Sequence, residues 1–131
     1  MCGLVGFYDP NKKLTLKQKE TLVSSMLFID SLRGVDNTGM VLATADKYQV
    51  HKTTQSGTSP LVQGWAKRYV YTDNSDVFMG HNRWGTVGGT STKTPHPFET
   101  ERLVGMHNGT LSFGWRGLVE KASQTASGSL Y

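Results

Sequence analysis

The sequence has little of the features that direct a protein to a membrane or out of the cell. It contains one cysteine, which excludes an internal disulfide and a cysteine-based zinc cluster. No apolar run approaches the roughly 18 residues that suggest a membrane-spanning helix, and the N-terminus lacks the basic region and apolar run of a signal peptide. We therefore expect a cytoplasmic protein without a membrane partner.

Charge of either sign is also sparse. Charged residues make up 18% of the chain and the formal net charge is +4, which argues against a disordered polyelectrolyte. The basic residues are scattered, without the interleaved aromatics of a nucleic-acid site, so we expect no nucleic-acid partner. The four histidines, at positions 51, 81, 96 and 107, lack the spacing of metal ligands. We therefore predict no metal. No cofactor is expected either.

Glycine is abundant, with 15 in 131 residues, which indicates tight turns and close backbone approaches. A chain of this length is expected to form one domain, over residues 1–131, with a real core. A hairpin around 45–47 implies antiparallel pairing, so we predict an α+β fold rather than a doubly wound parallel sheet.

An apolar stripe at three- and four-residue spacing predicts the buried side of the first helix and comprises Leu22, Val23, Met26, Ile29 and Leu32. Turn residues locate the limits of the other elements. Thr15 is expected to cap one helix, which Gly34 ends, and Ser59 followed by Pro60 is expected to begin another. The predicted strands span 3–8, 40–44, 48–53, 76–80 and 102–106, and the predicted helices span 16–32, 60–70 and 114–120.

Cys2 is the residue with the most direct chemical implication. If Met1 is removed, as is common before a small residue, the chain begins with a thiol and a free α-amine on one residue. Both kinds of group titrate near neutral pH, so the amine can act as the base for its own nucleophile. The alternative is a small buried hydrophobic residue at the start of a strand.

Two further motifs carry groups that bind anions. Gly-His-Asn-Arg-Trp-Gly-Thr at 80–86 is predicted to follow a strand, where Arg83 can grip a carboxylate and Trp84 can wall a small pocket. The alternative is a surface arginine stacked on the tryptophan. Asn108 and the amide of Gly109 can donate two hydrogen bonds to a developing oxyanion, although Asn-Gly is also a strong hairpin-turn signal.

These motifs together resemble the class II glutamine amidotransferase domains, which are N-terminal-nucleophile (Ntn) hydrolases. The resemblance rests on Met-Cys-Gly-Leu-Val-Gly at the N-terminus, Arg-Gly-x-Asp-x-x-Gly at 33–39, residues 80–86, His-Pro-Phe at 96–98 and His-Asn-Gly at 107–109. It covers residues 2 to about 111. It implies a four-layer αββα sandwich with antiparallel sheets.

The resemblance also implies a glutaminase site. Cys2 would be the nucleophile, and Asn108 with the Gly109 amide would form the oxyanion hole. Arg83 would bind the α-carboxylate of L-glutamine. Trp84, Thr86 and His107 would complete the substrate pocket. The ammonia released would pass to an acceptor on a synthase partner or on a C-terminal half.

Two departures from the family pattern keep other functions open. Ala126 stands where the family usually carries an aspartate that binds the α-amine of glutamine, and the C-terminal part is shortened. The main alternative is a catalytically degenerate, amidotransferase-like binding or scaffold module, with an exposed apolar edge. A third interpretation is an amidohydrolase with the same type of nucleophile that attacks another amide.

Overall fold

The computed structural model describes residues 2–85, 96–101 and 103–109, and these residues have an α+β arrangement. Its centre is a four-stranded antiparallel sheet with strand order β1-β4-β2-β3. The strands are β1 (Gly3–Tyr8), β2 (Asn37–Ala43), β3 (Tyr48–Thr53) and β4 (Val77–Arg83). The predicted α+β fold is confirmed.

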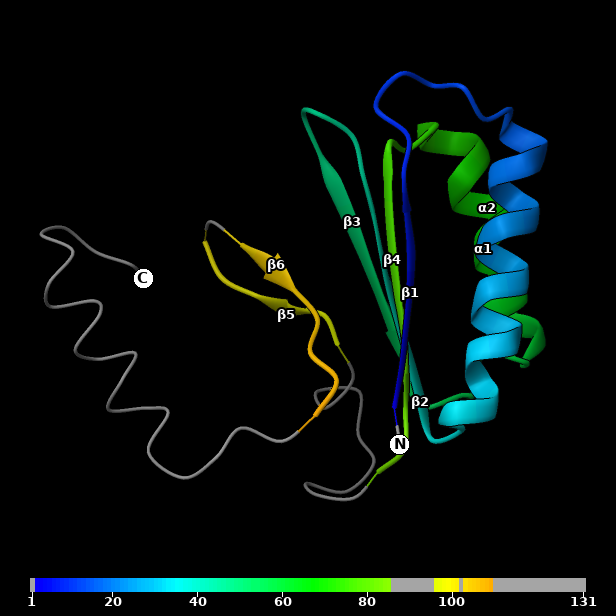
Figure 1. Cartoon of the computed structure of the whole chain (residues 1–131), viewed down its shortest axis with the longest axis vertical. Helices are drawn as coiled ribbons and strands as arrows, with labels where there is room; N and C mark the ends of the chain where they lie inside the picture. Colours follow the sequence, from blue (N-terminus) through cyan, green and yellow to red (C-terminus); the bar gives the residue numbers. More distant parts are fainter. Residues whose placement is uncertain (1, 86–95, 102, 110–131) are drawn as a thin grey trace, which may run out of the picture.

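Helices cover one face of this sheet, and a short hairpin lies on the other side (Figure 1). The helices are α1 (Leu16–Asp30), which continues into the 3₁₀ turn η1 (Ser31–Arg33), and α2 (Pro60–Asp73). The hairpin consists of β5 (Phe98–Glu99) and β6 (Val104–Gly105). This order of layers is compatible with an αββα sandwich, although the described residues contain no second helical layer. None of their helices is long and apolar enough to cross a membrane.

Both helices begin where the sequence predicts, because the expected caps form. The Thr15 side chain accepts a hydrogen bond from the Gln18 amide at 3.2 Å, and the Gln18 side chain accepts one from the Thr15 amide at 2.8 Å. This reciprocal pair is a capping box. The Ser59 side chain accepts from the Val62 amide at 3.3 Å, and Pro60 occupies the first turn of α2.

Gly34 ends the helical segment as predicted, but it caps the 3₁₀ turn after α1 and does not adopt the left-handed conformation. The helix stops at Asp30, and Gly34 follows η1 with extended backbone at φ −169° instead of a left-handed cap. Glycine is needed there for a different reason, which is close packing. A Cβ at this position would collide with the Arg83 carbonyl carbon and would lie 2.7 Å from the Trp84 nitrogen. The segment after α1 therefore lies directly against the end of β4.

The predicted hairpin and several strand limits can be compared with the structure. β2 and β3 form the hairpin, with Ala43 opposite Tyr48, as expected. β4 continues to Arg83, so the predicted strand at 76–80 is too short. The predicted strand at 102–106 is reduced to β6, which pairs with β5. The predicted helix at 114–120 lies outside the described residues.

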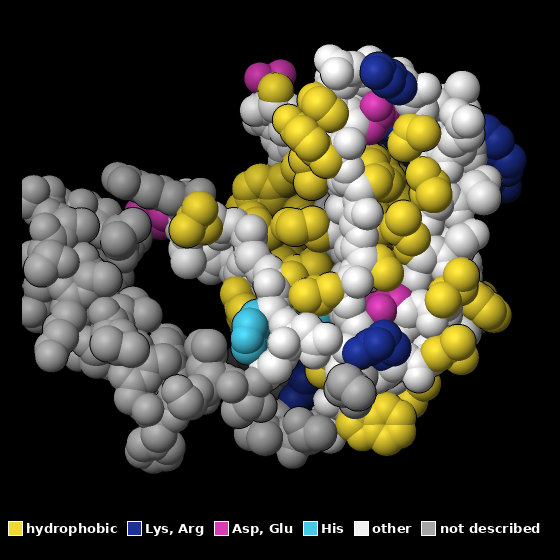
Figure 2. All heavy atoms as spheres, viewed as in Figure 1, with side chains coloured by type: hydrophobic (Ala, Val, Ile, Leu, Met, Phe, Trp, Pro, Cys, Tyr) yellow, Lys and Arg dark blue, Asp and Glu magenta, His cyan; other side chains and the backbone are white. Residues whose placement is uncertain are grey.

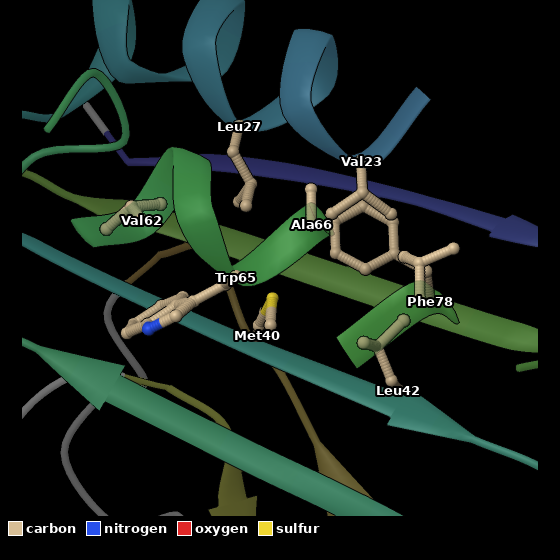
Figure 3. Close-up of a cluster of buried hydrophobic side chains, with 9 residues drawn as sticks. Val23, Leu27, Met40, Leu42, Val62, Trp65, Ala66 and Phe78 are labelled. Carbon is tan, nitrogen blue, oxygen red and sulfur yellow. The ribbon is translucent and has the colours of Figure 1, made fainter. Parts of the chain in front are cut away.

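The core lies between the helices and the sheet, where apolar side chains from both layers interlock (Figure 3). It comprises Val23, Leu27, Met40, Leu42, Val62, Trp65, Ala66, Val70 and Phe78. The buried side of α1 differs from its predicted apolar stripe. Ile29 and Leu32 are exposed, whereas Lys19 and Asp30 are buried in line with Val23 and Leu27.

Phe78 offers a test of this core. Its side chain is fully buried and belongs to this cluster, and its ring lies tilted against that of Phe7, with the ring centroids 5.7 Å apart. Phe78→Ala is expected to lower the free energy of unfolding by about 3–5 kcal/mol, because transfer and cavity costs add. Urea unfolding measures the loss. Tyr8→Ala, at a position that is 74% exposed on the neighbouring strand, is the matched control and should change stability by less than about 1 kcal/mol.

Candidate active site

The thiol of Cys2 lies at the junction between two neighbouring strands. β1 begins at Gly3, which pairs with Asn82 near the end of β4. Continued by one residue, this register places Cys2 opposite Arg83, the last residue of β4, and next to Trp84. The Trp84 amide points to the Cys2 sulfur at 3.4 Å, and the sulfur lies 3.7 Å from the Trp84 carbonyl oxygen. Cys2 is only half-buried, so its sulfur is not part of the apolar core. The interpretation of Cys2 as a core residue is therefore not favoured.

The carbonyl oxygen of Cys2 is held from two other directions. Asn108 donates to it through Nδ2 at 2.8 Å, and Arg33 donates through Nε at 3.2 Å. Arg33 belongs to η1, whereas Asn108 follows β6. The fold thus brings three distant segments to one residue. Arg33 belongs to the Arg-Gly-x-Asp-x-x-Gly motif at 33–39, but its contact with Cys2 was not predicted.

Gly109, next to Asn108, has a backbone conformation that favours glycine. Its φ is +145°, which side chains rarely tolerate. Between β5 and β6, the Thr100 amide donates to the Leu103 carbonyl at 2.8 Å and closes the end of this hairpin. The Asn-Gly pair is therefore not the turn of this hairpin. His107, Asn108 and Gly109 are all exposed.

Arg83 is buried at the end of β4, so it is not the surface arginine of the alternative interpretation. Its side chain is 9% exposed, and Nη1 donates to the Asn37 side-chain oxygen at 3.3 Å. The motif at 80–86 does not follow the strand as expected, because its first four residues form the end of β4. Trp84 lies just beyond and is 49% exposed. Thr86 and Ala126 lie outside the described residues.

Asp36 fixes the segment that follows β4. Its carboxylate accepts a hydrogen bond from the Gly85 amide at 2.6 Å, and its own amide donates to the Arg83 carbonyl at 3.0 Å. Because Trp84 lies between these two anchors, Asp36 also holds the amide that faces the Cys2 sulfur. The turn at 33–39 thus shapes the site as well as connecting α1 with β2.

Two buried imidazoles connect β4 to the segment before β5. The rings of His81 and His96 lie 4.1 Å apart between centroids, and among the described residues their nitrogens have no hydrogen-bond partner. Burial lowers the pKa of each to about 4, and the positive charges of Arg83 and His107 act in the same direction. Among the described residues, no group of three His, Cys, Asp or Glu side chains could hold a metal ion.

These imidazoles predict an acid-sensitive structure. A histidine whose pKa is about 6.5 when unfolded and about 4 when folded contributes stability above pH 6.5 that is lost as the pH falls towards 4. Protonation of the first of these two imidazoles should lower the free energy of unfolding by about 3 kcal/mol. Urea unfolding between pH 7 and pH 4 measures this loss. His81→Phe should flatten the curve, and an unchanged slope would show that the pair does not cause it.

An open apolar groove separates β1 and β4 from the hairpin. Its walls are Leu4, Val5, Gly6, Met79 and Met106, and its volume is about 250 Å³. Figure 2 shows hydrophobic side chains gathered between the hairpin and the sheet. Lys52 on β3 and Glu99 on β5 form an ion pair at 3.3 Å on the same side of the sheet. The Lys52–Glu99 ion pair therefore joins the hairpin to the sheet, while the apolar groove remains open.

The homologues of this chain are glutamine–fructose-6-phosphate aminotransferases. It is 30% identical to the enzyme of Helicobacter pylori over 111 residues, 31% identical to that of Oceanobacillus iheyensis over 113 residues, and 32% identical to that of Staphylococcus aureus over 119 residues. Each match covers 85% of this chain but 17% of the relative. The chain thus spans about 17% of the length of the curated relatives it matches. No family model matches the chain.

Proposed function

We propose that this chain is a class II glutamine amidotransferase domain that hydrolyses the side-chain amide of L-glutamine. The observation that carries the proposal is the environment of Cys2. Its sulfur faces the Trp84 amide, and its carbonyl oxygen is held by Asn108 and Arg33. The relatives, glutamine–fructose-6-phosphate aminotransferases, support glutamine as the nitrogen donor.

In the proposed reaction, Cys2 acts through the thiol and the α-amine that removal of Met1 exposes. The amine takes the thiol proton, and the sulfur attacks the amide carbon of glutamine. The C–N bond then breaks, and the proton moves from the amine to the departing ammonia. Water hydrolyses the resulting thioester to glutamate. The reaction needs no metal or redox cofactor.

Asn108 is proposed to stabilise the oxyanion together with the Gly109 amide. One Nδ2 hydrogen of Asn108 goes to the Cys2 carbonyl. A carboxamide nitrogen carries two hydrogens, so the other can serve the oxyanion that forms next to the sulfur. The bond to Cys2 fixes the orientation of the amide before substrate binds, and such preorganisation is a large part of oxyanion stabilisation.

The substrate end of the site is proposed to involve Arg83, whose planar guanidinium suits a carboxylate. Arg83 points away from the helices, because the neighbouring Asn82 faces Leu27 and Asp30 of α1. It therefore lies on the side of the sheet that faces the hairpin. Trp84, Thr86 and His107 would enclose the rest of glutamine. The ammonia would pass to an acceptor on a synthase partner or in a C-terminal half, within a four-layer αββα domain.

A binding or scaffold module is the second candidate, because of the open groove between the sheet and the hairpin. The groove is lined by apolar side chains, and Phe98 and Leu103 on the hairpin are 57% and 67% exposed. Apolar exposure of this kind is typical of surfaces that bind another protein. This function needs neither a free α-amine nor a reactive thiol, so covalent labelling of Cys2 separates the two.

Intact mass before and after incubation with a diazoketone analogue of glutamine tests the proposal. The first spectrum shows whether Met1 is absent. One adduct, blocked by glutamine and absent in Cys2→Ala, is the expected result. A processed chain that takes no adduct would contradict the glutaminase proposal and favour the binding module. A sample that retains Met1 would be processed with an aminopeptidase and measured again.

A further inference from the structure

Asp30 is a buried carboxylate that the proposed reaction does not use. It is the last residue of α1 and is 4% exposed. Burial raises the pKa of its carboxyl, although hydrogen bonds from Asn82 and the positive charge of Arg33 oppose the shift. The ionised group therefore costs folding free energy at neutral pH. The helix retains a carboxylate at this position despite that cost, so its contacts need an explanation.

The contacts of Asp30 lie at the start of β1 rather than in the core. One carboxylate oxygen, Oδ2, accepts from the Asn82 amide at 3.2 Å and from Asn82 Nδ2 at 3.0 Å. The other oxygen, Oδ1, lies so close to Gly3 that a Cβ on this glycine would collide with it. Gly3 and Asn82 are register partners. The carboxylate thus contacts both members of the strand pair next to Cys2.

Asn82 is itself fixed by its surroundings. Its Nδ2 donates to the Leu27 carbonyl at 3.1 Å, and its side-chain oxygen accepts from Thr38 Oγ1 at 2.7 Å. These contacts join α1, β4 and β2. Asn82, the hydrogen-bond partner of Asp30, is therefore held by three elements. The other oxygen of the Asp30 carboxylate lies against Gly3, the residue after Cys2.

We propose that Asp30 is a positioning residue, which holds the start of β1, and with it Cys2, at the distance from Trp84 and Asn108 that catalysis requires. This inference rests on the proposed function, because it assigns Asp30 to the same site. Asp30 touches none of the reacting groups. It acts through Gly3 and Asn82, and the hydrogen bonds to its charged oxygen are stronger than bonds to a neutral one.

Asp30→Asn keeps the size of the side chain but removes the charge and one acceptor oxygen. We expect it to lower the maximal rate of Cys2 labelling by the diazoketone analogue about tenfold or more, because small displacements of reacting groups reduce rates strongly. The analogue concentration for half-maximal rate should change less than about twofold, since Asp30 lies outside the substrate pocket. Thermal stability should remain or increase, because the desolvated charge is gone.

Lys19→Met is the matched control. Lys19 lies in the same buried row of α1, is fully buried, and pairs with Asp9 at 3.3 Å beyond the opposite end of β1. Its replacement should lower stability but leave the labelling rate of folded protein unchanged. If rates fall equally in both variants, Asp30 has only a structural role. If Asp30→Asn fails to fold, Asp30→Ser is measured in the same way.

Iodoacetamide separates failure of this inference from failure of the proposed function. Cys2 is the single cysteine, so alkylation reports on it without any need for glutamine recognition. Wild-type protein that reacts with iodoacetamide but not with the diazoketone analogue would contradict the glutaminase proposal alone. Wild-type protein labelled by the analogue, with Asp30→Asn labelled at the same rate, would overturn the positioning role alone.

Discussion

Cys2→Ser is expected to lower the rate of ammonia release from glutamine about a thousandfold or more while the fold stays intact. A thiol forms its reactive thiolate readily near neutral pH, whereas a serine hydroxyl does not ionise there, so the same amine activates serine far less in a site shaped for sulfur. The exchange alters one atom of a half-buried side chain outside the core, so stability should change by less than about 1 kcal/mol. A coupled glutamate dehydrogenase assay measures the ammonia, and circular dichroism measures the fold.

A second variant separates the thiol from the amine. Insertion of a lysine between Met1 and Cys2 leaves the thiol but moves the free α-amine to another residue. If the amine is the base, this variant should also lose ammonia release, while iodoacetamide still alkylates its thiol. Full activity in Cys2→Ser would refute the thioester route, and full activity in the insertion variant would refute the amine as base.

The elements whose signals are local were predictable from the sequence. The caps at Thr15 and Ser59 and the hairpin at residues 44–47 each depend on contacts a few residues apart. The residues that form these contacts are close together in the sequence. The starts of both helices and the β2–β3 pairing can therefore be predicted from local residue types. Strand ends were less predictable, because the length of β4 depends on pairing with β1 and β2 on both sides.

The buried face of α1 shows why apolar spacing alone misleads. Lys19 and Asp30 occupy buried positions because partners distant in sequence compensate their charges, namely Asp9 with the Ser75 carbonyl for Lys19 and Asn82 for Asp30. A pattern that treats charge as a mark of the surface assigns these positions to solvent. The opposite error occurred at Ile29, which was predicted to be buried because it is apolar but is exposed. One available signal was that Lys19, Val23, Leu27 and Asp30 follow a helical period.

The candidate site was partly predictable. Cys2 and Asn108 were selected from the sequence, and the structure places them in contact although 106 positions separate them. Their roles remain proposals. The contact of Arg33 with the Cys2 carbonyl and the anchoring of residues 84–85 by Asp36 were not predicted. Both depend on how the turn after α1 packs against β4, which Gly34 permits and which no local pattern reveals.

Asn108→Ala is expected to reduce kcat for glutamine hydrolysis about a hundredfold to a thousandfold, the usual effect of removing one oxyanion donor. KM should change little, because the donor acts on charge that develops after substrate binds. Asn108 is exposed and lies outside the core, so stability should be nearly unaffected. Steady-state measurement of ammonia release over a range of glutamine concentrations gives both constants.

Asn108→Asp sharpens this test, because a carboxylate has nearly the same shape but donates no hydrogen bond when ionised. It would place negative charge beside the oxyanion, so kcat should fall at least as far as in Asn108→Ala. Leu103→Ala, at an exposed position on the same hairpin, is the matched control and should retain kcat. If Asn108→Ala raised KM with kcat unchanged, the side chain would bind ground-state glutamine rather than the oxyanion. In that case the amides of Gly109 and Trp84 would be the next donors to test.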